Sequence, residues 1–188
     1  MGSHAMANFA ALSPLDDTGL RMIAGKLSFM SEHLPDRVDR AIVTRLQQDG
    51  RIANVDLAEK VTLSPSSCLR RTKALEADGV ISGYRVELDR AALHLGITVF
   101  VSLRVAQHSR ETSRLIEDQL TAIPAVVACH VVSGEADFLV EAVLPDLAAY
   151  ETLLLDQILA IEPVTDARST FAIRTVLSRG ALPLDALP

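Results

Sequence analysis

The sequence contains no tryptophan, only two cysteines and few aromatic residues, which amount to 4% of its 188 residues. Cys68 and Cys129 lie far apart and lack the spacing of metal ligands. We therefore expect neither a disulfide framework nor a metal site, and we expect both cysteines to be buried or half-buried in a protein of the reducing cytoplasm. The chain also has no run of about 18 apolar residues, which a membrane-spanning helix requires, so we expect no membrane association.

No catalytic motif is found in the sequence either. The glycines never fall into the patterns GxGxxG or GxxxxGK, which cradle phosphates. Cys129 and His130 are neighbours, but neighbouring side chains on a strand point to opposite faces, so they do not form a catalytic pair. The other histidines are scattered without the spacing of ligands. We expect no enzymatic activity and no cofactor.

Positive charge does not dominate the chain, whose formal net charge is −6 at pH 7. This balance argues against a nonspecific coat for nucleic acid. The charge is distributed unevenly, because residues 36–90 carry 10 basic and 9 acidic side chains whereas residues 91–188 carry 6 basic and 12 acidic ones. A DNA-binding domain joined to a domain that avoids DNA is expected to show this asymmetry. Residues 1–35, whose first four residues resemble an expression-tag remnant, are treated as an extension outside both domains.

Three short helices are predicted in the first half of the chain. Hydrophobic residues recur at helical spacing over residues 36–50, 54–61 and 65–78. Each segment begins at a residue type that caps helices, namely Asp36, Asn54 and Ser64. Pro65 is suited to the first helical position and Gly79 to the end of the third helix. The residues that follow, 80–88, are predicted to form a strand or a short hairpin.

The second and third helices, joined by a short turn, predict a helix-turn-helix, in which the N-terminal part of the last helix enters the major groove of DNA. Here that part carries small hydroxyl side chains, which allow close approach, followed by basic side chains that bind guanine edges or phosphates. The predicted DNA-contacting residues are Asn54, Ser64, Pro65, Ser66, Ser67, Arg70, Arg71 and Lys73. A solvated helix face that never touches DNA explains the same pattern, so this pattern alone leaves both interpretations open.

From residue 97 onward the hydrophobic pattern alternates between strands and helices. Strands are predicted over residues 97–106, 125–132, 137–144 and 164–177, and helices over 110–122 and 146–160. The order β-α-β-β-α-β is that of the ferredoxin-like, split βαβ arrangement. The chain is therefore predicted to be an α+β protein, with one domain over residues 36–90 and a second over residues 91–188.

Short motifs in both halves resemble the Lrp/AsnC family of transcriptional regulators, the leucine-responsive or feast/famine proteins. These motifs are Asp49-Gly50-Arg51, Leu57-Ala58, Leu63-Ser64, Gly83-Tyr84, Cys129-His130-Val131-Val132-Ser133-Gly134 and Asp137-Phe138-Leu139. The resemblance extends from about residue 36 to residue 178. It implies a winged helix-turn-helix followed by a ferredoxin-like domain, which dimerises through its sheet. The dimers are expected to assemble further, often into octamers.

The resemblance also implies that an amino acid or a similar small effector binds between dimers and alters assembly or DNA affinity. Asp137 or Glu135 is suited to bind the ammonium group of such a ligand, and backbone N–H groups of the Gly134 turn its carboxylate. The expected effector-binding residues are Val131, Ser133, Gly134, Glu135, Ala136, Asp137, Leu147, Thr170, Phe171 and Ala172. A plain hairpin turn at Gly134 and Asp137 is the alternative.

Two residues depart from the pattern of the family. Thr62 stands in the turn of the helix-turn-helix where relatives usually have glycine, which is compatible with the fold only if its φ is not strongly positive. Glu135 stands where aspartate is common. The predicted function is a cytoplasmic, effector-controlled regulator that binds double-stranded DNA. The alternative, supported by Thr62 and the acidic second half, is an effector-sensing oligomer that acts on an enzyme without binding DNA.

Overall fold

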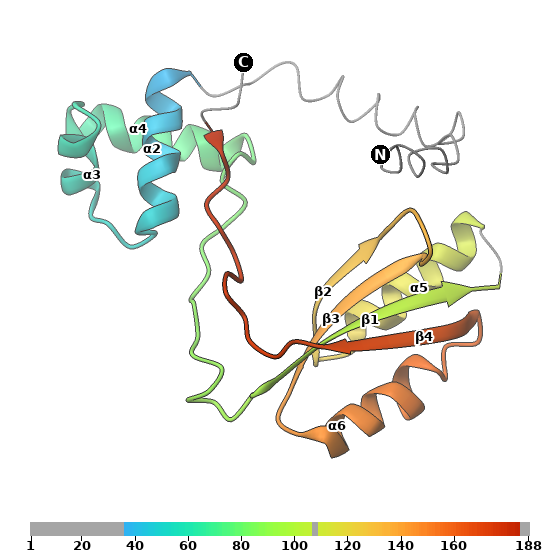
Figure 1. Ribbon diagram of the computed structural model, residues 1–188. Helices are drawn as coiled ribbons and strands as arrows, with labels where there is room; N and C mark the ends of the chain where they lie inside the picture. Colours follow the sequence, from blue (N-terminus) through green and yellow to red (C-terminus); the bar gives the residue numbers. More distant parts are fainter. Residues whose placement is uncertain (1–35, 107–108, 185–188) are drawn as a thin grey trace, which may run out of the picture. The chain divides into compact units, whose positions relative to one another are not determined.

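The computed structural model describes residues 36–106 and 109–184 (Figure 1). The chain divides into two compact units: one contains the residues up to Glu87 together with the segment from Leu177 onward, and the other contains Leu88–Val176. The predicted extension over residues 1–35 lies outside the described residues. The prediction assigns all of residues 91–188 to the second domain, whereas the segment from Leu177 groups with the first unit, where the N–H of Leu182 donates to Gln47 Oε1 at 2.6 Å.

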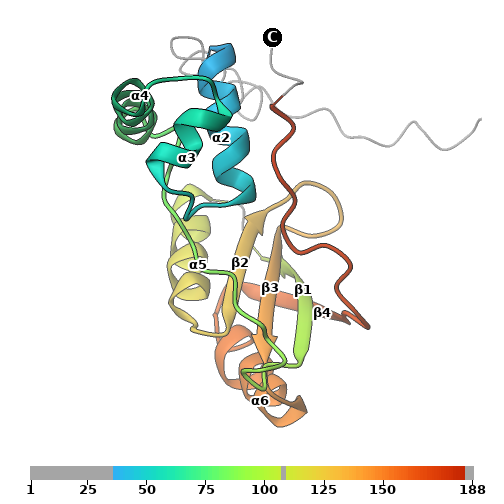
Figure 2. The same ribbon diagram turned by 90° about the vertical axis from the view of Figure 1, so that its left-hand side faces the viewer.

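The first unit is a bundle of three helices (Figure 2). Its helices are α2 (Arg37–Gln48), α3 (Asn54–Lys60) and α4 (Pro65–Ala77), within two residues of the predicted bounds. Their apolar faces meet in a small core, whose buried members are Ile42, Leu57, Ala58, Cys68 and Leu75. Among the described residues of the three helices, these five are the buried hydrophobic side chains, and partly buried hydrophobic side chains pack around them.

Local hydrogen bonds explain where the helices begin and end. Asp36 accepts the N–H groups of Val38 and Asp39 at 2.8 Å, and Ser64 accepts that of Ser67, so both predicted caps are confirmed. After α4, Gly79 has a φ of +73°, the left-handed conformation that glycine adopts at low cost. The predicted cap at Asn54 is wrong, because Ala53 occupies the cap position and Asn54 is the first helical residue.

The segment after α4 differs from its prediction. No strand is formed over residues 80–88, because the segment does not pair with another strand in the described structure. Two residues anchor it: the N–H of Ile81 donates to Leu75 O at 3.0 Å, and the hydroxyl of Tyr84 donates to Glu76 Oε1 at 2.9 Å, with the Tyr84 ring near Gly50. Burial, with the carboxylate of Glu76 as a second cause, raises the pKa of Tyr84. The segment is therefore fixed by one backbone hydrogen bond and one side chain rather than by a backbone ladder.

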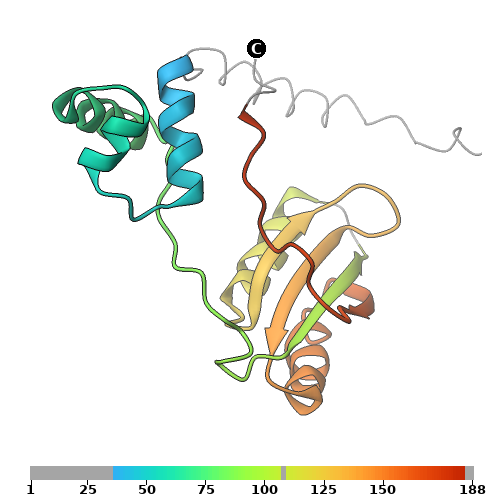
Figure 3. The same cartoon turned by 60° about the vertical axis from the view of Figure 1, so that its left-hand side comes forward.

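The second unit is a four-stranded antiparallel sheet with two helices (Figure 3). Its elements are β1 (Ile97–Val105), α5 (Arg110–Ala122), β2 (Val126–Val131), β3 (Phe138–Leu144), α6 (Leu147–Thr152) with the π-helical continuation Leu153–Ile158, and β4 (Val164–Phe171). The strands lie in the order β2-β3-β1-β4, which is the ferredoxin-like topology expected from the sequence. The last strand ends at Phe171 rather than at residue 177.

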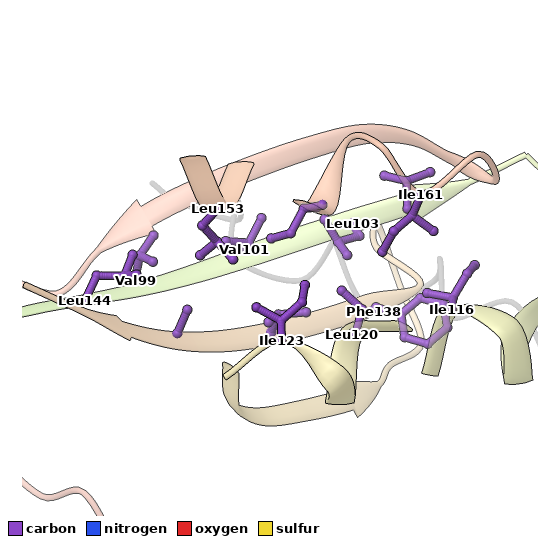
Figure 4. Packing of buried hydrophobic residues seen from close by; sticks show 14 residues of the cluster. Val99, Val101, Leu103, Ile116, Leu120, Ile123, Phe138, Leu144, Leu153 and Ile161 are labelled. Carbon is purple, nitrogen blue, oxygen red and sulfur yellow. The ribbon is translucent and has the colours of Figure 1, made fainter. Parts of the chain in front are cut away.

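Both helices of this unit cover the same face of the sheet. Alternate residues of β1, namely Val99, Val101 and Leu103, are fully buried against Ile116 and Leu120 of α5 and against the turns that follow α6 (Figure 4). The side chains between them on β1 point to the opposite face, which no helix of this unit covers (Figure 3). Within the described residues, no helix is long and apolar enough to cross a membrane.

Candidate functional site

The first turn of α4 presents a cluster of hydroxyl groups. Ser64 Oγ accepts the backbone N–H of Ser67 at 3.3 Å, donates to Ser67 Oγ at 2.9 Å and lies 3.2 Å from Ser66 Oγ. Ser64, Pro65 and Ser66 are exposed and Ser67 is half-buried. Exposed hydroxyls at the N-terminus of a 13-residue helix are suited to approach a phosphate or a base edge, because the helix end also carries partial positive charge.

The three predicted basic contacts on α4 have different surroundings. Arg70 and Lys73 are exposed, one helical turn beyond the serines. Arg71 instead forms ion pairs of 2.8 Å with Asp36 and Asp39 of α2. The hydrogen bonds to Asp39 and Asp36 raise the pKa of Arg71, and the two ion pairs hold its guanidinium group next to α2. This arrangement favours a role for Arg71 in holding α4 against α2, and leaves Arg70 and Lys73 as the basic side chains best placed for DNA.

Asn54 links the two helices of the helix-turn-helix. Its side-chain Nδ2 donates to the backbone oxygen of Pro65 at 2.9 Å. Because Pro65 is the first residue of α4, this bond fixes the start of α4 relative to α3. The geometry gives Asn54 a positioning contact that the sequence prediction did not contain.

Thr62, in the turn between α3 and α4, has a φ of +58°, so the expectation that threonine is compatible with this turn only without a strongly positive φ is wrong. A β-branched side chain in this left-handed conformation is strained, at a cost of about 1–2 kcal/mol. The strain persists because flanking backbone bonds, Thr62 N–H to Glu59 O and Leu63 N–H to Ala58 O, close the turn.

Replacing Thr62 with glycine is therefore expected to stabilise the first unit by about 1 kcal/mol, since the gain from removing strain exceeds the entropy that glycine adds to the unfolded chain. Thermal unfolding of Thr62→Gly and Thr62→Ala checks this. Thr62→Ala should raise the free energy of unfolding less than Thr62→Gly does, because alanine still carries a Cβ. A glycine variant no more stable than the wild-type protein would contradict the strain.

In the second unit, the predicted effector loop, residues 132–137, joins β2 to β3. Gly134 has a φ of +125°, which favours glycine, and the Nε of Arg104 donates to the backbone oxygen of Glu135. Asp137 is tied to β1: its Oδ2 accepts the N–H of Val105 at 2.9 Å, and its own N–H donates to Leu103 O at 2.9 Å. These bonds fix the loop to β1, and the bond to Val105 lies where the β1–β4 register shifts.

The predicted effector-binding residues fall into two groups at opposite ends of the sheet. The residues Val131 and Ser133–Asp137 lie at the end where Leu103 pairs with Phe138. Thr170, Phe171 and Ala172 lie at the other end, where Phe171 pairs with Val99, and Leu147 follows β3 at that same end. Leu103 and Val99 are four residues apart, a separation of about 13 Å along a strand. One chain therefore does not bring the two groups together.

A second aromatic residue, which the sequence prediction missed, accompanies Phe171. The ring of Tyr150 on α6 stands edge-on to the ring of Phe171, with centroids 4.8 Å apart. Tyr150 lies three residues after Leu147, and this helical spacing on one face was the signal available in the sequence. In the first unit, the structure also places basic side chains of α2 and Lys60 of α3 around a groove that the sequence analysis did not single out.

Cys129 faces the helix-covered side of the sheet, packed against the core. Burial, with Glu117 as a second cause, raises the pKa of its thiol. Cys68 is buried in the first unit. Across residues 36–106 and 109–184, no group of three or more His, Cys, Asp or Glu side chains is placed to hold a metal ion.

Comparison with known proteins matches each of the two units to a known domain family. Residues 35–82 match the family of winged helix-turn-helix DNA-binding domains, and residues 98–182 match the Lrp/AsnC ligand binding domain. The Bkd operon transcriptional regulator of Pseudomonas aeruginosa is 36% identical over 149 residues, which cover 79% of this chain and 97% of that protein. The chain belongs to the Lrp/AsnC family. It is a transcriptional regulator in which a DNA-binding helix-turn-helix precedes a ligand-binding domain.

Two further regulatory proteins are similar to this chain over most of their length. The leucine-responsive regulatory protein of Escherichia coli K12 is 36% identical over 141 residues, covering 75% of this chain and 86% of that protein. A transcriptional regulator of Neisseria meningitidis, whose crystal structure is a complex with L-Met, superposes with a TM-score of 0.76 at 33% identity, covering 81% of this chain and 98% of that one. The predicted DNA-contacting residues lie within the winged helix-turn-helix match, and the predicted effector-binding residues lie within the Lrp/AsnC ligand binding domain match.

Proposed function

We propose that this regulator binds double-stranded DNA through the first turn of α4 and that a free amino acid, bound to the ligand-binding domain, modulates that binding. The observation that carries the proposal is the similarity, at 33% identity, to a regulator crystallised with L-Met, a match that covers 81% of this chain. The exposed serines at the start of α4, followed by Arg70 and Lys73, support the DNA contact. In this proposal residues 36–90 carry the DNA-binding function, and the amino acid is an effector rather than a cofactor of an enzyme.

The separation of the two groups of effector residues supports a site shared between chains. The Gly134 loop of one chain and the Phe171 end of β4 lie at opposite ends of one sheet, so a second copy must supply one of the two groups for a single ligand to touch both. The uncovered sheet face, which includes the half-exposed Phe100, is the surface we assign to dimerisation. Dimers built on it would assemble further, into an octamer or a related ring, in the cytoplasm where the DNA lies.

Selection of duplexes from a random-sequence pool by the full chain tests the DNA-binding part of this function. We expect an enriched sequence whose affinity exceeds that of a shuffled duplex of equal length and falls as salt rises. No sequence preference, with or without any of the amino acids, would contradict regulation through DNA. If an amino acid still shifted the oligomer in that case, the alternative of an enzyme-regulating module without DNA binding would hold.

A thermal-shift screen against the amino acids tests the effector part. A ligand at about 100 times its Kd stabilises the native state by about 2.7 kcal/mol. For the second unit, Leu88–Val176, that raises the melting temperature by about 11–22 °C. The amino acid found in this way is then added to the DNA-binding assay, where a changed affinity or a changed oligomeric state is expected. The absence of any shift across the panel would contradict an amino-acid effector.

A further inference from the structure

A groove in the first unit lies between α2 and the end of α3 and has a volume of about 660 Å³. Its lining residues are Arg37, Arg40, Ala41, Thr44, Arg45, Gln48 and Lys60. Four of the seven are basic and none is acidic. This groove plays no part in the helix-turn-helix contact described above.

The helical repeat explains how the basic side chains come to lie together. On α2, positions 37, 40, 44 and 48 recur at three- and four-residue spacing on one face, while the buried Ile42 marks the face toward the core. The acidic residues at the start of α2 point away from this face, because the cap residue Asp36 and Asp39 both form ion pairs with Arg71 of α4. Residues 36–90 carry nearly equal numbers of basic and acidic side chains, yet the fold collects positive charge in this groove.

The length of the basic face indicates what kind of anion fits it. From Arg37 to Gln48 the face spans twelve residues, whose first and last Cα atoms are separated by about 16 Å at 1.5 Å of rise per residue. That is several times the size of a carboxylate or a single phosphate group. DNA carries one negative charge per about 1.7 Å of its axis, so a stretch of duplex presents several phosphates over the same length.

We propose that this groove binds phosphates of the DNA backbone that flank the bases contacted by α4. The proposal rests on the DNA-binding function proposed above. Lys60 ends α3 only four residues before Ser64, so the edge of the groove lies within about 14 Å of the serine cluster. A duplex seated on the first turn of α4 brings its neighbouring phosphates to this distance. The groove supplies attraction that is independent of sequence, while α4 supplies the discrimination.

The test uses the full chain and the duplex that the wild-type protein selects, with the triple variant Arg37→Gln, Arg45→Gln and Lys60→Gln. Arg40 is left unchanged. Loss of three phosphate contacts lowers the slope of log affinity against log salt by about 2.7. A fourfold rise in salt should then weaken the variant about 40-fold less than it weakens the wild-type protein. The ratio of affinities for the selected and the shuffled duplex should stay unchanged.

Two controls make the result specific. The charge-keeping variant Arg37→Lys, Arg45→Lys and Lys60→Arg should retain the wild-type slope. The variant Arg114→Gln removes an exposed positive charge from α5 of the other unit and should leave the slope nearly unchanged. An unchanged slope in the triple glutamine variant, with normal sequence preference and a normal melting temperature, would overturn the groove contact alone. A variant that lost its sequence preference would overturn the assignment to phosphates. Wild-type protein that binds no duplex would overturn the function on which the proposal rests.

Discussion

Ile42→Ala is expected to abolish DNA binding and to leave the ligand-binding domain folded. Ile42 is 0% exposed and belongs to a core with only five buried members. Truncating a buried isoleucine costs about 2–5 kcal/mol, because apolar contacts are lost and a cavity remains. The first unit has about 60 described residues, and a domain of that size is stable by about 3–9 kcal/mol in total. The single truncation therefore removes a large part of its stability.

Calorimetric unfolding and DNA binding of the same preparation check this expectation. The variant should lose its affinity for the selected duplex while the amino acid still shifts the transition of the second unit. Val55→Ala is the matched control on the same unit, because Val55 is 63% exposed and its truncation should change stability by about 0.5 kcal/mol or less. Leu120→Ala, in the core of the second unit, should have the converse effect. Equal loss of both transitions in Ile42→Ala would show that the units unfold together and contradict the expectation.

The elements of both units were predictable where short-range physics decides them. Asp36 and Ser64 cap helices with hydrogen bonds to N–H groups two or three residues away, and Gly79 supplies a left-handed turn. The order of strands and helices in the second unit also followed from periodicity, and its ferredoxin-like topology is confirmed. Each of these signals is contained within a few neighbouring residues.

The incorrect predictions concern features that depend on distant partners. Residues 80–88 have the composition of a strand, but a strand forms only when another strand pairs with it, and here Tyr84 anchors the segment to Glu76 instead. Asn54 has the chemistry of a cap, but its amide reaches Pro65 eleven residues away. The ion pairs of Arg71 with Asp36 and Asp39, at the start of α2, were likewise not predicted, while its DNA contact stays a prediction. No local pattern distinguishes these contacts from a solvated side chain.

The predicted effector site shows the same limit at the scale of the domain. The resemblance to relatives placed residues 133–137 and 170–172 in one site, but the register of the sheet puts them at opposite ends. A list of residues cannot state which copy of the chain contributes each of them. The register does constrain this choice, because any ligand that touches both groups must lie between two chains.

Asp137→Asn is expected to lower the affinity for the effector amino acid by about 10- to 100-fold with little change in stability. Oδ2 of Asp137 accepts the N–H of Val105 at 2.9 Å, and the amide oxygen of asparagine can accept the same bond. A neutral amide cannot replace the charge-assisted bond to an ammonium group, which contributes about 1.5–3 kcal/mol. The substitution thus separates the structural task of Asp137 from the ligand contact that we propose for it.

Titration calorimetry with the amino acid found by the thermal-shift screen measures the affinity, and thermal unfolding without ligand measures stability. Asp137→Ala should lower both the effector affinity and the stability. It also leaves the Val105 N–H without this acceptor, which costs about 1–3 kcal/mol of stability. Glu135→Gln is the matched control: it removes the same charge from an exposed position of the same loop. If only Glu135→Gln weakened binding, the ammonium anchor would be Glu135. If neither did, no carboxylate of the loop would bind the ammonium group, and the bond of Asp137 to the Val105 N–H would be a structural contact.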